Sequence, residues 1–197
     1  ISAGVPDRTT CPVALRDAFE WCAANRPTSE PAAKLLWGDV RYGNIVYDDA
    51  ARCPKAILDW DMVSAGPVEM DLGWLLALEA VQYDLSRMRV PGFGDRAATI
   101  TRAEVALGRA LVDLDWYETF ALVRASAVST RIALLFQRAG EPSMFKVGED
   151  PTLNAARRRI AATGQLYRPL PRRGGGRRLV CSPQRSSPAA GARPASF

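Results

Sequence analysis

The segment "LLWGDVRYGNIVYDD", residues 35 to 49, places polar side chains at the edges of apolar runs. Asp39 follows a glycine, Asn44 comes five residues later, and a β-rich run begins at once. A second β-rich run, "KAILDWD" at residues 55 to 61, follows a turn that contains Pro54. Two such runs on either side of turn residues predict a hairpin, with Asn44 at the start of one strand and Asp59 near the end of the other.

In that hairpin, Asp39, Asn44 and Asp59 would form a cluster of oxygen-bearing side chains. Mg²⁺ prefers one or two carboxylates together with phosphate oxygens and water. A carboxylate that is not on the metal can accept a proton from a hydroxyl nucleophile. These are the groups that phosphoryl transfer needs, because positioning and charge neutralisation do most of the catalysis. Asp-x-x-x-x-Asn is also common in turns and helix caps, so the residues alone leave that structural interpretation open.

The residue types exclude several other chemistries. The chain contains no histidine, which excludes Ser-His and Cys-His nucleophilic catalysis and makes a carboxylate the expected proton acceptor. Cys11, Cys22, Cys53 and Cys181 form no C-x-x-C pair, which favours free thiols in a reducing cytoplasm over a zinc site. No apolar run reaches the roughly 18–20 residues of a membrane span, and the N-terminus is not typical of a signal peptide. We expect a cytoplasmic protein that does not bind membranes, and the oligomeric state stays open.

The net charge of +5 combines two parts of opposite sign. Residues 151–197 hold ten arginines and no acid, whereas residues 1–150 hold 16 basic and 21 acidic side chains. From about residue 168 the chain is mostly Arg, Gly, Pro, Ser and Ala, which bury too little apolar surface to offset the entropy of ordering. We therefore expect a folded body over residues 1–167 and a disordered basic tail over residues 168–197. The tail would bind polyanions in a salt-dependent way, but it has almost no aromatic residues for specific nucleic-acid recognition.

Apolar residues at helical spacing predict that most of the body is helical. The predicted helices cover residues 11–25, 68–85, 101–113 and 115–139. The second of them has little polar surface, so we expect it to be buried on most sides. In the longest helix one apolar face is formed by Ala121, Ala125, Val128, Ile132 and Leu135. A different face of that helix carries Arg124, Arg131 and Arg138, and this arginine stripe is either a solvated face or a basic wall near an anionic ligand.

Two blocks of the sequence resemble the aminoglycoside phosphotransferase-like enzymes, which are relatives of the protein kinases. "WGDVRYGN" is similar to their catalytic loop H-G-D-x-x-x-x-N, with Trp37 in place of the histidine that packs under the loop. "AILDWDMVSAGPVEMDLGWLL" is similar to the next block, a metal-binding Asp in an I-D-W context followed by G-D-P-x-x-D-L-A. The resemblance is specific over residues 35–78 and extends to about residue 166. It implies an α+β, mainly α fold: the C-terminal lobe of the protein-kinase-like fold with a small β-hairpin.

The resemblance also implies a role for each matching residue. Asp39 is similar to the catalytic Asp, which orients the acceptor hydroxyl and can deprotonate it. Asn44 and Asp59 correspond to the metal ligands that hold Mg²⁺ against the phosphates of the nucleotide. Asp71 corresponds to an Asp that braces the catalytic loop through backbone hydrogen bonds, which makes it structural. Asp61, two residues beyond Asp59, is either in the outer coordination sphere of the metal or simply solvated.

The activity that the resemblance implies is that of a small-molecule O-phosphotransferase. Such an enzyme transfers the γ-phosphate of ATP or GTP, with Mg²⁺, to a hydroxyl of a small metabolite that the sequence does not identify. The glycine-rich loop and the strand lysine that grip the nucleotide have no counterpart in this chain. Only 38 residues precede Asp39 and the first residue is Ile1, so we expect a fragment without its N-terminal lobe. The alternatives are a catalytically inactive kinase-like remnant or binding module, and a nucleic-acid-associated protein that uses the basic tail.

Overall fold

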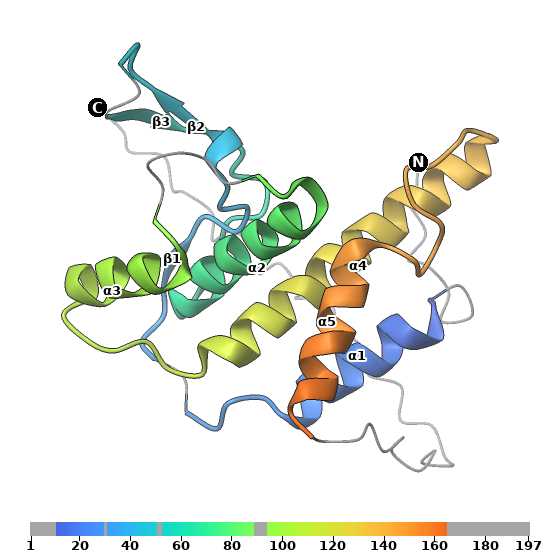
Figure 1. Ribbon diagram of the computed structural model, residues 1–197, viewed down its shortest axis with the longest axis horizontal. Coiled ribbons are helices and arrows are strands. Elements are labelled where there is room, and N and C mark those ends of the chain that lie inside the picture. Colours follow the sequence, from blue (N-terminus) through green and yellow to red (C-terminus); the bar gives the residue numbers. More distant parts are fainter. Residues whose placement is uncertain (1–10, 30, 51–52, 89–93, 165–197) are drawn as a thin grey trace, which may run out of the picture.

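The computed structural model describes residues 11–29, 31–50, 53–88 and 94–164, and this part of the chain is mainly helical (Figure 1). Its helices are α1 (Val13–Ala24), α2 (Glu69–Ser86), α3 (Arg96–Leu107), α4 (Leu114–Ala139) and α5 (Pro151–Ala162). Its strands are β1 (Lys34–Leu36), β2 (Ile45–Tyr47), β3 (Pro54–Ile57) and β4 (Ser64–Gly66), with a single 3-10 turn, η1 (Tyr42–Asn44), before β2. These elements confirm the predicted mainly α, α+β class. The predicted tail, residues 168–197, lies outside the described residues.

Helix α4 lies at the centre of the helical part and packs against α2, α5 and α1 (Figure 1). Leu122 and Val123 of α4 are buried in the same core as Trp74 of α2 and Leu153 of α5. Burying an apolar side chain of this size contributes about 1.5–3 kcal/mol. Helix α2 is therefore fixed against the longest helix of the described fold.

The apolar face predicted on α4 is only partly buried. Ala121 and Ala125 are buried, but Val128, Ile132 and Leu135 are 46%, 47% and 52% exposed. Helix α4 has 26 residues, whereas α2 has 18 and α5 has 12, so its neighbours cannot cover its whole length. Beyond Ala125, α4 is instead buried along small side chains: Ser126, Thr130 and Ala133.

Helix α4 is also long and apolar enough to cross a membrane, judged by length and composition alone. The sequence predicted no membrane span because charged residues interrupt every apolar run. In the structure, α4 packs against three other helices, and a central helix needs an apolar composition for that packing.

The strands form two small antiparallel sheets. In the first, β2 pairs with β3 so that Ile45 lies opposite Ile57, with an irregularity between Val46 and Tyr47. This pairing confirms the predicted hairpin, which projects away from the helices (Figure 1). The second sheet, in which β1 pairs with β4, was not predicted, because each of its strands has only three residues.

Two helices differ from the sequence prediction. Helix α3 begins five residues earlier and ends six residues earlier than predicted. Its N-terminus is capped by Asp95, whose side chain accepts a hydrogen bond from the N–H of Ala98, and Gly108, with φ of 65°, ends it. Helix α5 was not predicted. Asp150 caps it by accepting the N–H of Leu153 at 3.0 Å, and its run of three arginines obscures the apolar spacing.

Candidate active site

The chain leaves β1 through a turn that requires glycine. Gly38 has φ of +91°, and a Cβ at this position would lie 2.2 Å from the carbonyl oxygen of Met62. Residues with side chains rarely adopt this conformation, and here they would also clash with backbone. The turn therefore packs directly on the segment after β3, which brings Asp39 close to the residues that follow that strand.

Asp71, in the first turn of α2, binds the backbone of the glycine turn. Its Oδ2 accepts the N–H of Trp37 at 2.7 Å, and its Oδ1 accepts the N–H of Gly38 at 2.9 Å. The helix N-terminus stabilises the carboxylate, and hydrogen bonds to a charged acceptor are among the stronger ones. This is the arrangement that a structural brace of the turn requires.

Both carboxylate oxygens of Asp39 accept hydrogen bonds. Oδ1 accepts the indole N–H of Trp74 at 3.1 Å. Oδ2 accepts the side-chain amide of Asn44 at 2.9 Å and the Nε–H of Arg41 at 3.0 Å. The side chain keeps 15% exposure. Asp39 is therefore fixed in orientation while it can still be reached from solvent.

The same contacts determine which atom of Asn44 is available to a ligand. Its Nδ2 donates to the backbone oxygen of Asp39 at 3.2 Å as well as to Oδ2. The amide is almost wholly buried, and its Oδ1 accepts no hydrogen bond from another described residue. The amide oxygen is thus the free coordinating atom of Asn44.

Asp59 lies at the same end of the hairpin as Asn44. The N–H of Leu58 donates to the backbone oxygen of Asn44 at 2.8 Å, which places Asp59 one residue beyond that pair. The indole N–H of Trp37 donates to the carbonyl oxygens of Leu58 and Asp59 at 2.9 and 3.0 Å. Trp37 stands where the catalytic loop H-G-D-x-x-x-x-N has its histidine. Its side chain therefore links the glycine turn to the hairpin.

The carboxylates of Asp59 and Asp61 are exposed and form no ion pair with a described residue. Asp59 adopts the left-handed conformation, with φ of 59°, which is uncommon for a residue with a side chain. Asp61 lies in the turn that follows.

The oxygen donors present fit magnesium. Among the described residues, no group of three or more His, Cys, Asp or Glu side chains is placed to hold a metal ion. The free amide oxygen of Asn44 and the carboxylate of Asp59 are hard donors, and Mg²⁺ accepts such a small protein contribution when phosphate and water supply the rest. A site of this kind would depend on a bound nucleotide.

Sequence reasoning missed two residues that bind Asp39, namely Arg41 and Trp74. Trp74 lies in the helix that was expected to be buried on most sides, and its indole N–H donates to the Asp39 carboxylate. The signal that could have found it is chemical, because a buried indole usually needs an acceptor for its N–H.

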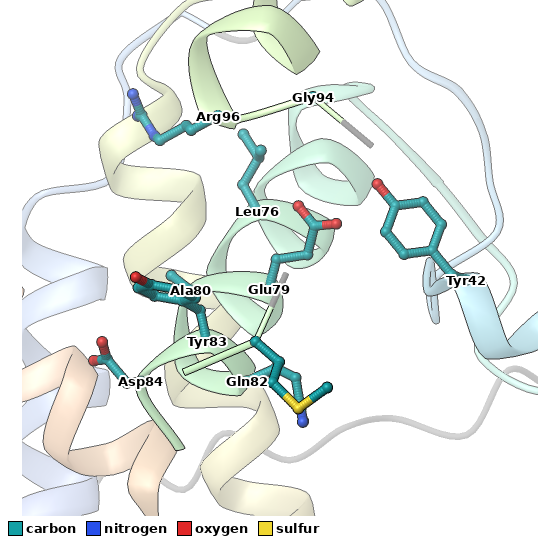
Figure 2. A pocket seen from close by; sticks show the side chains of 10 residues that line it. Tyr42, Leu76, Glu79, Ala80, Gln82, Tyr83, Asp84, Gly94 and Arg96 are labelled. Carbon is teal, nitrogen blue, oxygen red and sulfur yellow. The ribbon is translucent and has the colours of Figure 1, made fainter. Parts of the chain in front are cut away.

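A cavity of about 320 Å³ opens beside the turn that carries Asp39 (Figure 2). Tyr42, between Asp39 and Asn44 in the chain, lines one side, and residues of α2 line the other. Burial, followed by a hydrogen bond to Glu79, raises the pKa of Tyr42 above its usual range. Arg96 also lines the cavity, but its guanidinium turns toward Glu118, with an Nη2 to Oε1 distance of 2.6 Å.

The described part of the chain has a mainly helical α+β fold, and two comparisons indicate the class to which it belongs. Residues 5–107 match the phosphotransferase enzyme family (APH). The chain is also similar to the crystal structure of a "putative aminoglycoside phosphotransferase" from Ralstonia eutropha JMP134, with a TM-score of 0.55 and 19% sequence identity. The alignment covers 75% of this chain and 46% of that one, so this chain spans about half the length of the solved relative. At this identity the similarity concerns the fold.

The family match covers more than half of the chain. The chain therefore belongs to the phosphotransferase enzyme family.

Proposed function

We propose that this chain is the C-terminal lobe of a small-molecule O-phosphotransferase, which transfers the γ-phosphate of ATP or GTP to a hydroxyl acceptor. The observation that carries the proposal is the direct contact between Asp39 and Asn44 at the end of the hairpin where Asp59 lies. A proton acceptor and two oxygen donors for a metal then belong to one local structure. That combination is what phosphoryl transfer uses.

Asp39 orients the acceptor hydroxyl in this mechanism. Three donors already bind its carboxylate, which keeps its direction fixed. Positioning of this kind suits phosphoryl transfer, because most analyses give it a loose transition state in which positioning contributes more than early proton removal. The hydroxyl would approach the exposed edge of the carboxylate and transfer its proton late.

Asn44 and Asp59 would hold the magnesium ion, through the amide oxygen and the carboxylate respectively. Bound there, the ion would neutralise charge on the phosphates of the nucleotide. Asp39 keeps the amide of Asn44 in the orientation that leaves its oxygen free, so the proton acceptor also organises the metal ligand. Asp71 acts at a distance by fixing the backbone between these residues.

The cavity beside Tyr42 is the candidate site for the acceptor. Its volume of about 320 Å³ lies at the lower end of the range for small-molecule pockets, which suits a metabolite better than a large antibiotic. The nucleotide would need a second lobe for its grip. The proposal of a single lobe is supported by the mainly helical content of the chain and by its coverage of 46% of the solved relative.

The test is a coupled nucleotide-consumption assay with a panel of small hydroxyl compounds. It uses the chain itself and, where the gene encodes one, the preceding lobe joined to it. We expect slow turnover by the chain alone and faster turnover by the two-lobed protein. Asp39→Asn should lower kcat by about 100-fold or more, because the nearly isosteric amide cannot accept the proton.

Two further variants separate the metal from the fold. Asp59→Asn should raise the Mg²⁺ concentration needed for half-maximal rate, whereas Asp49→Asn, an exposed acid at the far end of the hairpin, should not. A two-lobed protein in which Asp39→Asn keeps its rate would refute the mechanism. Nucleotide binding without turnover by that protein would instead support the alternative of an inactive kinase-like binding module.

A further inference from the structure

The guanidinium of Arg124, on α4, lies near the turn that carries Asp39. Its central carbon is 4.9 Å from the centre of the Trp74 ring, and it forms no ion pair with any described residue. Burial lowers the pKa of Arg124, while the nearby carboxylates of Asp71 and Asp39 act in the opposite direction. A partly buried cation therefore stacks on an indole in the field of two carboxylates.

The edge of the same indole faces the proposed proton acceptor. Trp74 is buried, and its N–H donates to Oδ1 of Asp39 at 3.1 Å. One ring thus contacts Arg124 through its face and Asp39 through its edge. The three residues come from α4, α2 and the turn after β1.

This contact differs from those of the other tryptophans, all of which are described. Trp37, Trp60 and Trp116 donate their indole N–H to backbone carbonyls, and the N–H of Trp21 is buried without a partner. Trp74 is the one whose N–H binds a side chain. A buried indole in this fold therefore does not need a carboxylate.

We infer that Trp74 and Arg124 are positioning residues that fix the Asp39 carboxylate for phosphoryl transfer: Arg124 holds and polarises the indole, and the indole N–H holds Oδ1. The inference rests on the proposed function for its kinetic consequence. Asn44 and Arg41 both bind Oδ2, so Trp74 is the donor that stops the carboxylate from turning about χ2, a torsion with broad energy wells. A cation on the ring face attracts the π-system and polarises the N–H toward its acceptor.

The three arginines of the stripe on α4 do not share one environment. Arg124 is partly buried against Trp74, whereas Arg131 and Arg138 are exposed. Arg131 lies two helical turns further along the same helix, away from Trp74. It provides a matched control, since Arg131→Met makes the same chemical change at a solvated position.

The kinetic test is a double-mutant cycle on kcat in the full-length protein. Trp74→Phe keeps a ring but removes the donor, and Arg124→Met keeps an apolar stem but removes the cation. Each should lower kcat by about 10- to 100-fold, because a misplaced catalytic group loses rate on this scale, while the KM for nucleotide stays nearly unchanged. Arg124→Met should have little further effect in the Trp74→Phe background, and Arg124→Lys should recover part of the rate. Arg131→Met should leave kcat unchanged.

The second test needs no turnover. An indole-¹⁵N spectrum of the protein contains one N–H signal for each of its five tryptophans, and the signal that Trp74→Phe removes is that of Trp74. Asp39→Asn and Arg124→Met should each shift this signal and speed its exchange with water several-fold, whereas Arg131→Met should do neither. If Trp74→Phe does not fold, Trp74→Tyr, which also removes the indole, identifies the signal.

The outcomes separate the inference from the proposed function. Independent, additive effects of Trp74→Phe and Arg124→Met on kcat would overturn the inference that Arg124 acts on Asp39 through Trp74. A Trp74 signal that Arg124→Met leaves unchanged would overturn it as well. A wild-type protein without turnover would refute the proposed function. The indole signal would then still decide whether Arg124 and Trp74 fix Asp39.

Discussion

Replacing Asp71 by asparagine should destabilise the fold although the side chain keeps its shape. In the wild type both oxygens of Asp71 are occupied, because they accept the backbone N–H groups of Trp37 and Gly38 at 2.7 and 2.9 Å. Asparagine offers one oxygen and one NH₂ group, and the NH₂ group cannot accept a hydrogen bond. One backbone N–H is then left facing another donor in a buried turn.

The magnitude follows from these two bonds. A hydrogen bond to a charged group contributes about 1.5–3 kcal/mol and a neutral one about 0.5–1.5 kcal/mol, and an unsatisfied buried N–H costs about 1–3 kcal/mol. Asp71→Asn should therefore lower the free energy of unfolding by roughly 2–4 kcal/mol. For a domain of this size that corresponds to a fall in Tm of roughly 5–12 °C.

The assay is urea unfolding followed by tryptophan fluorescence, together with a thermal melt. Asp49→Asn is the matched control, since Asp49 is exposed in the hairpin turn and its replacement should change stability by less than about 0.5 kcal/mol. An Asp71→Asn variant as stable as the Asp49→Asn variant would show that the two backbone bonds do not brace the turn.

Four further predictions concern the rest of the fold. Glu69 is fully buried and paired with Arg109 at 2.6 Å, so Arg109→Met should lower the free energy of unfolding in urea titrations, because it leaves the buried carboxylate without its partner. Burial alone would raise the pKa of Glu69, but hydrogen bonds from Arg109 and from backbone hold that pKa below its usual range. The pair therefore stabilises the fold at neutral pH, and this contribution is lost as the pH falls through the folded pKa, so Glu69→Gln should flatten the acid side of a stability–pH curve. Asp150→Ala removes the cap of α5 and the partner of buried Ser126 at 2.6 Å, which should cost about 2 kcal/mol in the same titration. Burial raises the pKa of Cys22 to about 12, so a thiol reagent at neutral pH should modify exposed Cys53 quickly and Cys22 only after unfolding. Mass spectrometry of the labelled peptides measures both rates. Fast labelling of Cys22 in the folded protein would contradict its burial.

Much of the candidate site could be predicted because it is made of neighbours in the chain. Gly38 and Asp39 form a turn whose backbone conformation only glycine tolerates, and Asn44 follows at a distance that turn chemistry sets. The hairpin that carries Asn44 and Asp59 follows from two β-rich runs around turn residues. The long helix ends at Gly140, as predicted, because glycine adopts the left-handed conformation that stops a helix, here with φ of +73°.

The remaining features depend on contacts between distant parts of the chain. The pairing of β1 with β4 joins segments about 30 residues apart, and each is too short to carry a β pattern of its own. Val128, Ile132 and Leu135 have the spacing of a buried face but are exposed, because burial depends on whether another helix reaches that far.

The same distinction applies to the candidate site. The sequence alone determined which residues carry the oxygen atoms, since Asp39, Asn44 and Asp59 lie at spacings set by a turn and a hairpin. Only the tertiary structure decided what orients them. Trp74 is 35 residues from Asp39, and its indole reaches the carboxylate because α2 returns across the turn. Arg124, 50 residues further along the chain, meets that indole because α4 packs on α2, and no periodicity within one helix specifies which residue of another it will contact.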